Sequence, residues 1–162
     1  MPTATARPVR VRRLAAAFLD GVLALVIALV PAALVSVGKG RLFGVGLLIG
    51  AAYLLLRDGI PYAEWGPRSL GKRWIGLRPY QTDGLEVTWA VSARRNATVG
   101  GAALLWAVVY LVGGALTGPI GRALLWAGAA LVALEAALVL FDAAGRRLGD
   151  RLARTRVVEA RA

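Results

Sequence analysis

The sequence contains no cysteine and no histidine. Without cysteine, the chain has no disulfide framework and no thiolate nucleophile. Without histidine, it lacks a common metal ligand and the side chain that most often carries protons near neutral pH. The remaining residues show no pattern that pairs a nucleophile with a base. We therefore expect a protein that is not an enzyme, with no catalytic residues, no metal site and no cofactor.

Acidic residues are also scarce. The chain of 162 residues has 9 Asp and Glu against 20 Lys and Arg, for a net charge of +11, although 58% of its residues are hydrophobic. The mean hydropathy is +0.64. Such a composition requires that apolar and charged residues occupy different segments. The apolar residues gather in four runs with almost no charge, at 14–37, 42–56, 97–117 and 123–141.

These runs are long enough to be membrane spans. About 20 helical residues cross a hydrocarbon core of about 30 Å, and the first, third and fourth runs meet that length. The second run is short, but Arg41 and Arg57 at its ends can extend to the membrane interface. We predict an all-α membrane protein with four transmembrane helices in a single domain over residues 1–162. A soluble protein with unusually apolar core helices is the alternative. Gly46 and Gly50 in the second run have the GxxxG spacing that admits a closely packed neighbouring helix.

The positions of Lys and Arg predict the orientation. Four lie in the N-terminal tail, seven in the loop over 57–96 and six in the tail over 142–162, whereas the other side has only Lys39, Arg41 and Arg122. Basic residues favour the cytoplasmic side, so we expect both termini, the loop and the tail to be cytoplasmic. Because the basic residues lie close to the membrane ends, we expect contact with anionic lipid headgroups and no nucleic-acid partner.

Two carboxylates interrupt the apolar runs, Asp20 in the first and Glu135 in the fourth. A carboxylate at the bilayer centre costs about 2.5 to 3.5 kcal/mol on insertion scales. Each lies six residues, or about 9 Å, from the cytoplasmic end of its run, so the two could share a site, a proton or a basic partner. Arg94 and Arg95 are candidate partners, while Arg13 lies two turns from Asp20 and should not bond to it directly. A cation or proton site and a salt-bridged packing role both remain open.

The stretch GPRSLGKR, residues 66–73, has glycine and lysine spaced as in a phosphate-binding loop. We expect no nucleotide there, because Arg73 stands where the loop needs a hydroxyl and Pro67 lacks a backbone N–H. Leu70, Trp74 and Leu77 instead form one helical stripe. We predict a short interfacial helix that places Lys72 and Arg73 near lipid headgroups.

The segments after this helix have the pattern of short strands. Residues 77–80 and 85–88 flank an Asp83-Gly84 turn signal, and residues 155–158 of the tail read TRVV. A two-stranded hairpin alone is marginally stable. We therefore predict a small cytoplasmic hairpin that the tail segment joins as a third strand.

Three of these segments together resemble the RDD family of bacterial integral membrane proteins. Arg13, Ala16 and Asp20 follow the family's R-x-x-A-x-x-x-D pattern, SLGKRWIGLR its loop pattern, and RRLGDRLARTRVV its tail pattern. Asp150 matches the second aspartate, and Asp142 is the alternative. Many members have histidine where Gly149 stands, and Glu135 matches no family motif. The resemblance implies a bacterial cytoplasmic (inner) membrane protein and an involvement in transport of undetermined ligands.

Two functions follow as hypotheses. The first is a small ion- or proton-coupled transporter that acts as an oligomer, with Arg13, Asp20 and Glu135 along its pathway. The second is a membrane scaffold or accessory subunit, in which Arg13, Asp20 and Asp150 are structural and the basic cytoplasmic face binds lipid or a partner membrane protein.

Overall fold

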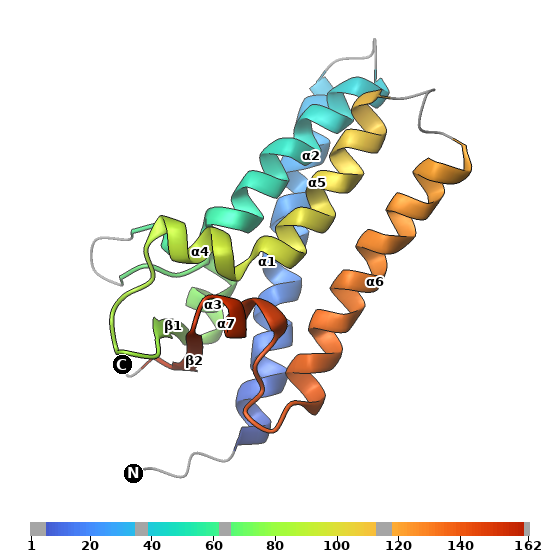
Figure 1. Ribbon diagram of the computed structural model, residues 1–162. Coiled ribbons are helices and arrows are strands. Elements are labelled where there is room, and N and C mark those ends of the chain that lie inside the picture. The colour runs from blue at the N-terminus through green and yellow to red at the C-terminus, as the bar shows by residue number, and fades with distance from the viewer. Residues whose placement is uncertain (1–5, 35–38, 62–65, 113–117, 161–162) are drawn as a thin grey trace.

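The computed structural model describes residues 6–34, 39–61, 66–112 and 118–160 (Figure 1). The described chain is mostly helical, with one small sheet. Its elements are α1 (Ala6–Leu34), α2 (Lys39–Leu56), η1 (Arg57–Gly59), α3 (Leu70–Ile75), β1 (Leu77–Gln81), α4 (Trp89–Arg95), α5 (Ala97–Val112), α6 (Pro119–Phe141), α7 (Leu148–Leu152) and β2 (Thr155–Glu159).

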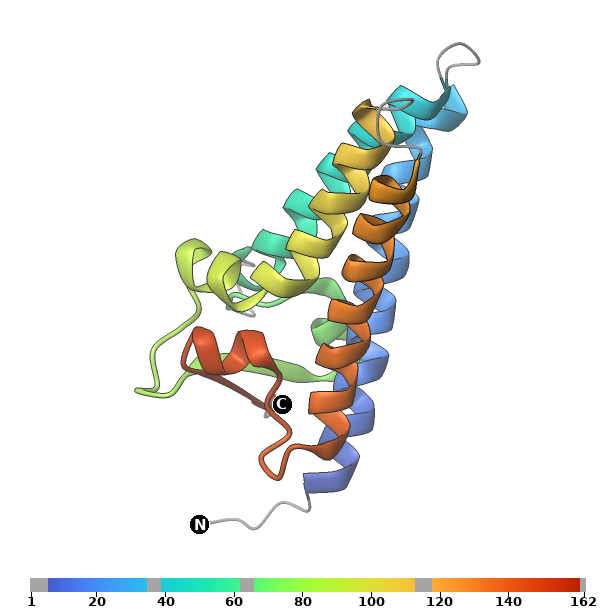
Figure 2. The ribbon, with the colours of Figure 1, turned by 45° about the vertical axis from the view of Figure 1, so that its right-hand side comes forward.

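The four apolar runs form the long helices α1, α2, α5 and α6, which lie lengthwise in one bundle (Figures 1 and 2). Three segments are long and apolar enough to cross a membrane: Val9–Val30, Leu42–Gly59 and Pro119–Phe141. Helices α4 and α5 pass the same test only as a pair bent by 75°, which is the geometry of a broken span or of a re-entrant loop, so the described residues contain three to four candidate spans. The predicted, mostly helical fold with long apolar helices is therefore confirmed. Residues 35–37 and 113–117 of the predicted spans lie outside the described residues.

Small residues bring α1 and α2 into close contact. A Cβ atom at Gly46 would lie 2.1 Å from the carbonyl oxygen of Ala28, and one at Gly50 would lie 2.8 Å from that of Ala24. Only glycine leaves room for this backbone approach, so the predicted packing role of the GxxxG spacing is confirmed.

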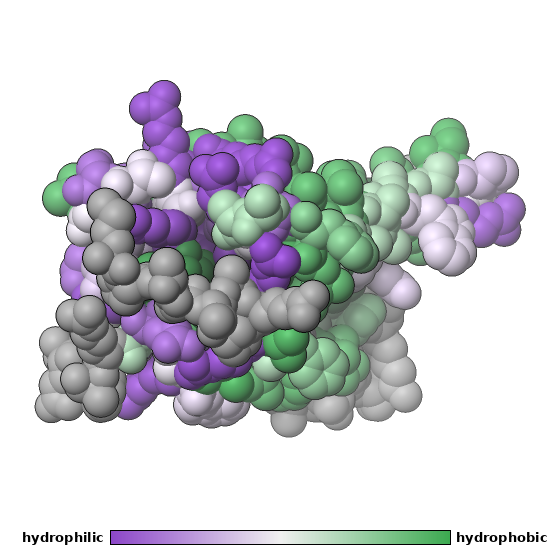
Figure 3. Space-filling model, turned by 90° about the horizontal axis from the view of Figure 1, so that it is seen from below, coloured by the Kyte–Doolittle hydropathy of each residue, from purple (hydrophilic) through white to green (hydrophobic). Residues whose placement is uncertain are grey.

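The shorter elements form what we call the capping layer, which comprises α3, β1, α4, α7 and β2. It lies beside the lower halves of α1 and α6, beneath the ends of α2 and α5 (Figure 1). Seen from below, hydrophilic and hydrophobic residues occupy separate parts of the visible face (Figure 3). The segregation along the sequence thus becomes a segregation in space.

The sheet joins the loop to the tail. Strand β1 pairs antiparallel with β2, with Leu77 opposite Glu159 and Gln81 opposite Thr155. The predicted pairing of the tail segment is therefore confirmed. The described sheet has two strands rather than three, because residues 85–88 contribute only an isolated bridge between Tyr80 and Glu86.

The expected strand over residues 85–88 was wrong, because that segment leads directly into helix α4, which begins at Trp89. Val87 is buried against Val91 and Ala153. The Thr88 hydroxyl accepts a hydrogen bond from the Val91 amide and caps α4. A side-chain cap satisfies a helical N–H group that has no partner within the helix.

The predicted helix at 70–77 is present but shorter. Helix α3 ends at Ile75, and Gly76 terminates it with a φ of 70°, a conformation that glycine adopts readily. Leu77 then starts β1 and is fully buried, whereas Trp74 is 70% exposed. The predicted stripe therefore does not form one face of a helix.

Candidate functional site

Among the described residues, nine buried ionisable side chains take part in ion pairs where the bundle meets the capping layer. We call this set the charge network; its members are Arg13, Asp20, Arg57, Asp58, Lys72, Arg95, Glu135, Arg147 and Asp150. They come from α1, η1, α3, α4, α6 and α7, together with Arg147 just before α7. Ion pairs thus join segments that are distant in sequence.

Asp150 is the most heavily paired carboxylate of the network. It accepts a hydrogen bond from Arg13, and its Oδ1 lies 2.8 Å from Arg95 Nε and 3.5 Å from Arg147 Nε. Burial would raise the pKa of Asp150, but the three guanidinium groups outweigh it and hold that pKa well below its usual range. Asp142 instead binds Arg151 near the surface. Of the two candidates for the second aspartate of the family motif, Asp150 is the one that pairs with Arg13.

Asp20 is fully buried and makes three contacts. Its Oδ2 lies 3.1 Å from Arg57 Nη1, and its Oδ1 accepts hydrogen bonds from the Tyr53 hydroxyl and the Gly71 amide. A Cβ atom at position 71 would lie 2.2 Å from the Ala16 carbonyl oxygen, so α3 reaches Asp20 only because this residue is glycine.

These contacts test the partners expected for Asp20. The absence of a direct bond to Arg13 is confirmed, since Arg13 pairs with Asp150. The expected pairing with Arg94 or Arg95 was wrong, because Arg95 pairs with Asp58 and Asp150 and Arg94 is exposed. The observed partner is Arg57, which follows an apolar run. At that place in the sequence a residue that anchors the helix at the membrane interface and a buried ion-pair partner look the same.

Lys72 is buried rather than facing lipid headgroups. Its ammonium nitrogen lies 2.7 Å from Asp58 Oδ1 and 3.3 Å from the Ser69 hydroxyl. Burial lowers the pKa of Lys72 to about 8, although Asp58 opposes the change. The expectation that Lys72 contacts lipid headgroups was therefore wrong, because Lys72 is buried. Its neighbour Arg73 is exposed on α3. Asp58, which sequence reasoning missed, follows Arg57 and gave no signal beyond its charge.

Glu135 has a different environment from Asp20. Its Oε1 accepts hydrogen bonds from the Thr98 hydroxyl at 2.5 Å and the Gly149 amide at 3.1 Å. Its Oε2 is buried without a hydrogen bond, 3.9 Å from Arg147 Nε. The two carboxylates thus use different basic partners, Arg57 for Asp20 and Arg147 for Glu135.

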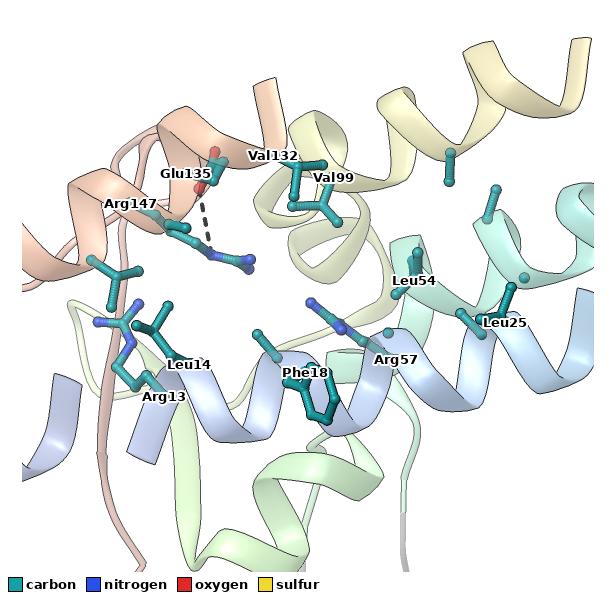
Figure 4. A pocket seen from close by; sticks show the side chains of 18 of the residues that line it. Arg13, Leu14, Phe18, Leu25, Leu54, Arg57, Val99, Val132, Glu135 and Arg147 are labelled. Carbon is teal, nitrogen blue, oxygen red and sulfur yellow. Dashed lines mark ion pairs between the residues drawn. The ribbon is translucent and has the colours of Figure 1, made fainter. Parts of the chain in front are cut away.

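A cavity of about 480 Å³ lies among α1, α2, α5 and α6 next to the charge network. Its polar end is formed by Arg13, Arg57, Lys72, Arg95, Glu135 and Arg147, and its remaining wall is apolar (Figure 4). Phe18 and Leu25 of α1 line the cavity yet are 71% and 49% exposed, so the cavity reaches the outer surface of the bundle. Among the described residues, no group of three acidic side chains is placed to hold a metal ion.

A family model matches most of the chain. The model of the RDD family covers residues 7–154, which include the whole bundle and the charge network. No curated protein and no solved structure matches the chain. The family match agrees with the three motifs found in the sequence, and two of its motif residues, Arg13 and Asp150, are in direct contact.

Proposed function

The chain belongs to the RDD family, and on that premise we propose that it is a small membrane transporter coupled to protons or another cation, with Glu135 as the group that meets the transported ion. The single observation that carries the proposal is the position of Glu135. Among the described residues it is the only carboxylate that lines the cavity, and its Oε2 has no hydrogen-bond partner. A buried carboxylate with an unbonded oxygen can take up and release a proton.

Asp20 has a structural role in this proposal. It does not line the cavity. Its Oδ1 accepts hydrogen bonds from α2 and α3, and its Oδ2, which like Glu135 Oε2 has no hydrogen bond, lies 3.1 Å from Arg57 of η1. Removing either charge of a buried ion pair is strongly destabilising because the other charge is left unpaired. Asp20 therefore fixes how α3 and the end of α2 pack on α1.

The proposed transporter crosses the bacterial inner membrane four times, with both termini cytoplasmic. The strongly asymmetric distribution of Lys and Arg supports this orientation. Four helices in one chain leave little room for a wide aqueous route, so the proposal includes assembly of several copies. Anionic lipid headgroups would contact the basic surface of the capping layer, including Arg73.

The test is flux across reconstituted membranes. Purified protein in liposomes with an imposed pH or sodium gradient should carry a gradient-driven proton flux, reported by an internal pH-sensitive dye. Glu135→Gln should abolish the flux while the variant still elutes as a folded protein with native helix content. Wild-type flux in Glu135→Gln, or no flux from the wild type under any cation gradient, would overturn the proposal.

A scaffold or accessory subunit is the second candidate. It is favoured by the Arg13–Asp150 pair, which joins the first helix to the tail and leaves both motif residues fully occupied within the fold. This candidate predicts no flux from folded wild-type protein and co-purification of a defined membrane protein.

A further inference from the structure

The lining of the cavity has a strong excess of positive charge. Five cationic residues and one acidic residue, Glu135, face it. The whole charge network also carries one positive charge more than negative, with Arg13, Arg57, Lys72, Arg95 and Arg147 against Asp20, Asp58, Glu135 and Asp150. An uncompensated charge buried away from water is costly. A single negative charge placed in the cavity would balance the network.

Two guanidinium groups are placed to receive such a charge. Arg57 and Arg147 enter the cavity from opposite sides (Figure 4). Arg57 contacts Asp20 through Nη1, while its Nε is buried and has no hydrogen-bond partner. A buried donor without a partner is destabilising. An anionic acceptor between the two arginines would satisfy this donor and gain charge-assisted hydrogen bonds.

The rest of the cavity is suited to a hydrocarbon chain. Its wall includes Phe18, Leu25, Leu47, Leu54, Val99 and Val132. The volume of about 480 Å³ lies within the usual range of small-molecule pockets, about 300 to 1,000 Å³. Because Phe18 and Leu25 are exposed on the apolar outer surface of α1, the opening faces the side of the bundle that hydrocarbon would cover. A ligand with an apolar tail can therefore enter sideways.

We infer that the cavity binds a single-chain amphiphile with one negative charge, a fatty-acid-like molecule, whose head lies between Arg57 and Arg147 and whose chain follows the apolar wall. The inference assigns a ligand to the same cavity and goes beyond the proposed function, since it is argued from the charge and shape of the cavity. Binding and flux are measured separately, so each can fail while the other stands.

The direct test is contact quenching of Trp106, which lines the cavity. A variant that retains Trp106 and replaces the other four tryptophans by phenylalanine is purified in detergent and titrated with 9,10-dibromostearate. Bromine quenches indole fluorescence at contact distance. Quenching should saturate at one equivalent per chain. A companion variant that retains only Trp126, which is 75% exposed and lies outside the lining, should show only linear, non-saturating quenching.

Two glycines provide a matched pair of variants that keep the charges intact. A Cβ atom at Gly21 or at Gly101 would meet nothing within 4 Å, but only Gly21 lines the cavity. Leucine is a better helix former than glycine, so both substitutions should preserve the fold. In the Trp106-only background, Gly21→Leu should weaken dibromostearate binding at least tenfold, and Gly101→Leu should leave it unchanged.

Two further ligands test the head and the tail. The methyl ester of dibromostearate, which has no charge, should bind at least tenfold more weakly than the acid. A dibrominated phosphatidylglycerol, which has two chains, should give no saturable quenching. Equal binding of the ester, saturable quenching by the two-chain lipid, or undiminished binding by Gly21→Leu would each overturn the inference. Saturable binding of dibromostearate without any proton flux would support the inference and contradict the proposed transport function.

Discussion

Asp20 and Glu135 have the same description in the sequence but different surroundings in the fold. Both are carboxylates in apolar runs, six residues from the cytoplasmic end. Both also accept a backbone hydrogen bond from a glycine, Gly71 for Asp20 and Gly149 for Glu135. Asp20, however, has an arginine at 3.1 Å and lies outside the cavity, whereas Glu135 has one at 3.9 Å and lines it. Equal positions within apolar runs therefore do not give two carboxylates the same surroundings.

The largest expected effect is the loss of the Asp20 charge. Asp20→Asn leaves the Arg57 guanidinium buried with no counter-charge at 3.1 Å. Removing one partner of a buried ion pair costs about 3 to 5 kcal/mol, so the melting temperature in detergent should fall sharply or the protein should fail to fold. A melting temperature within a few degrees of the wild type would contradict the structural role of Asp20.

The next largest effect is the dependence of the unfolding free energy on pH that Lys72 causes. Burial lowers the pKa of Lys72 from 10.5 to about 8. The unfolded chain binds the Lys72 proton more tightly than the folded protein does. The free-energy cost of burying the charged ammonium group is therefore fully present below pH 8, and it is relieved as the pH rises from 8 towards 10.5. The gain approaches about 3 kcal/mol at most, at about 1.4 kcal/mol per pKa unit. Thermal unfolding between pH 7.5 and 10 should show it, and Lys72→Met should flatten the rise.

Gly71 tests whether α3 must approach α1. The added methyl group of Gly71→Ala would lie 2.2 Å from the Ala16 carbonyl oxygen, a backbone atom that cannot move aside alone. Overpacking of this kind costs about 1 to 3 kcal/mol. The control is Gly101→Ala, whose Cβ meets nothing within 4 Å and which should stabilise its helix by up to about 1 kcal/mol. Equal stability of the two variants would contradict the close approach.

The smallest effect is the coupling within the Asp20–Arg57 pair. Double-mutant cycles between contacting residues usually give about 0.5 to 3 kcal/mol. In Asp20→Asn with Arg57→Gln, the double variant should be more stable than the sum of the two single losses predicts, because neither charge is left alone. Strict additivity in the measured unfolding free energies would show that the two side chains do not interact.

Much of the fold could be predicted from the sequence, because apolar runs and turn signals are local. The four long helices, the close helix packing at Gly46 and Gly50, and the pairing of the tail strand all appear in the structure. The strand expected at 85–88 does not appear, since Val87 packs against Val91 of α4 and against Ala153, which follows α7. Local strand propensity was overridden by packing.

The site was less predictable because its pairs are formed between distant segments. Arg13 and Asp150 were singled out by the family motifs, but their contact depends on how the tail folds back. Arg57 and Asp58 follow the end of an apolar run and Lys72 lies in the basic loop after it, where a charge on the membrane surface and a buried one look alike in sequence. The cavity depends on the spacing of four helices, which composition does not encode.

The central claim is that Asp20 maintains the fold while Glu135 serves the cavity. The most direct measurement compares Asp20→Asn and Glu135→Gln in the same detergent and in the same proteoliposomes, recording unfolding and gradient-driven proton flux. We expect Glu135→Gln to remain folded and to lose flux, with a smaller loss of stability than Asp20→Asn because Arg147 also pairs with Asp150. Asp20→Asn should lose several kcal/mol of stability. A stable Asp20→Asn together with an unstable Glu135→Gln, or full flux in Glu135→Gln, would contradict it.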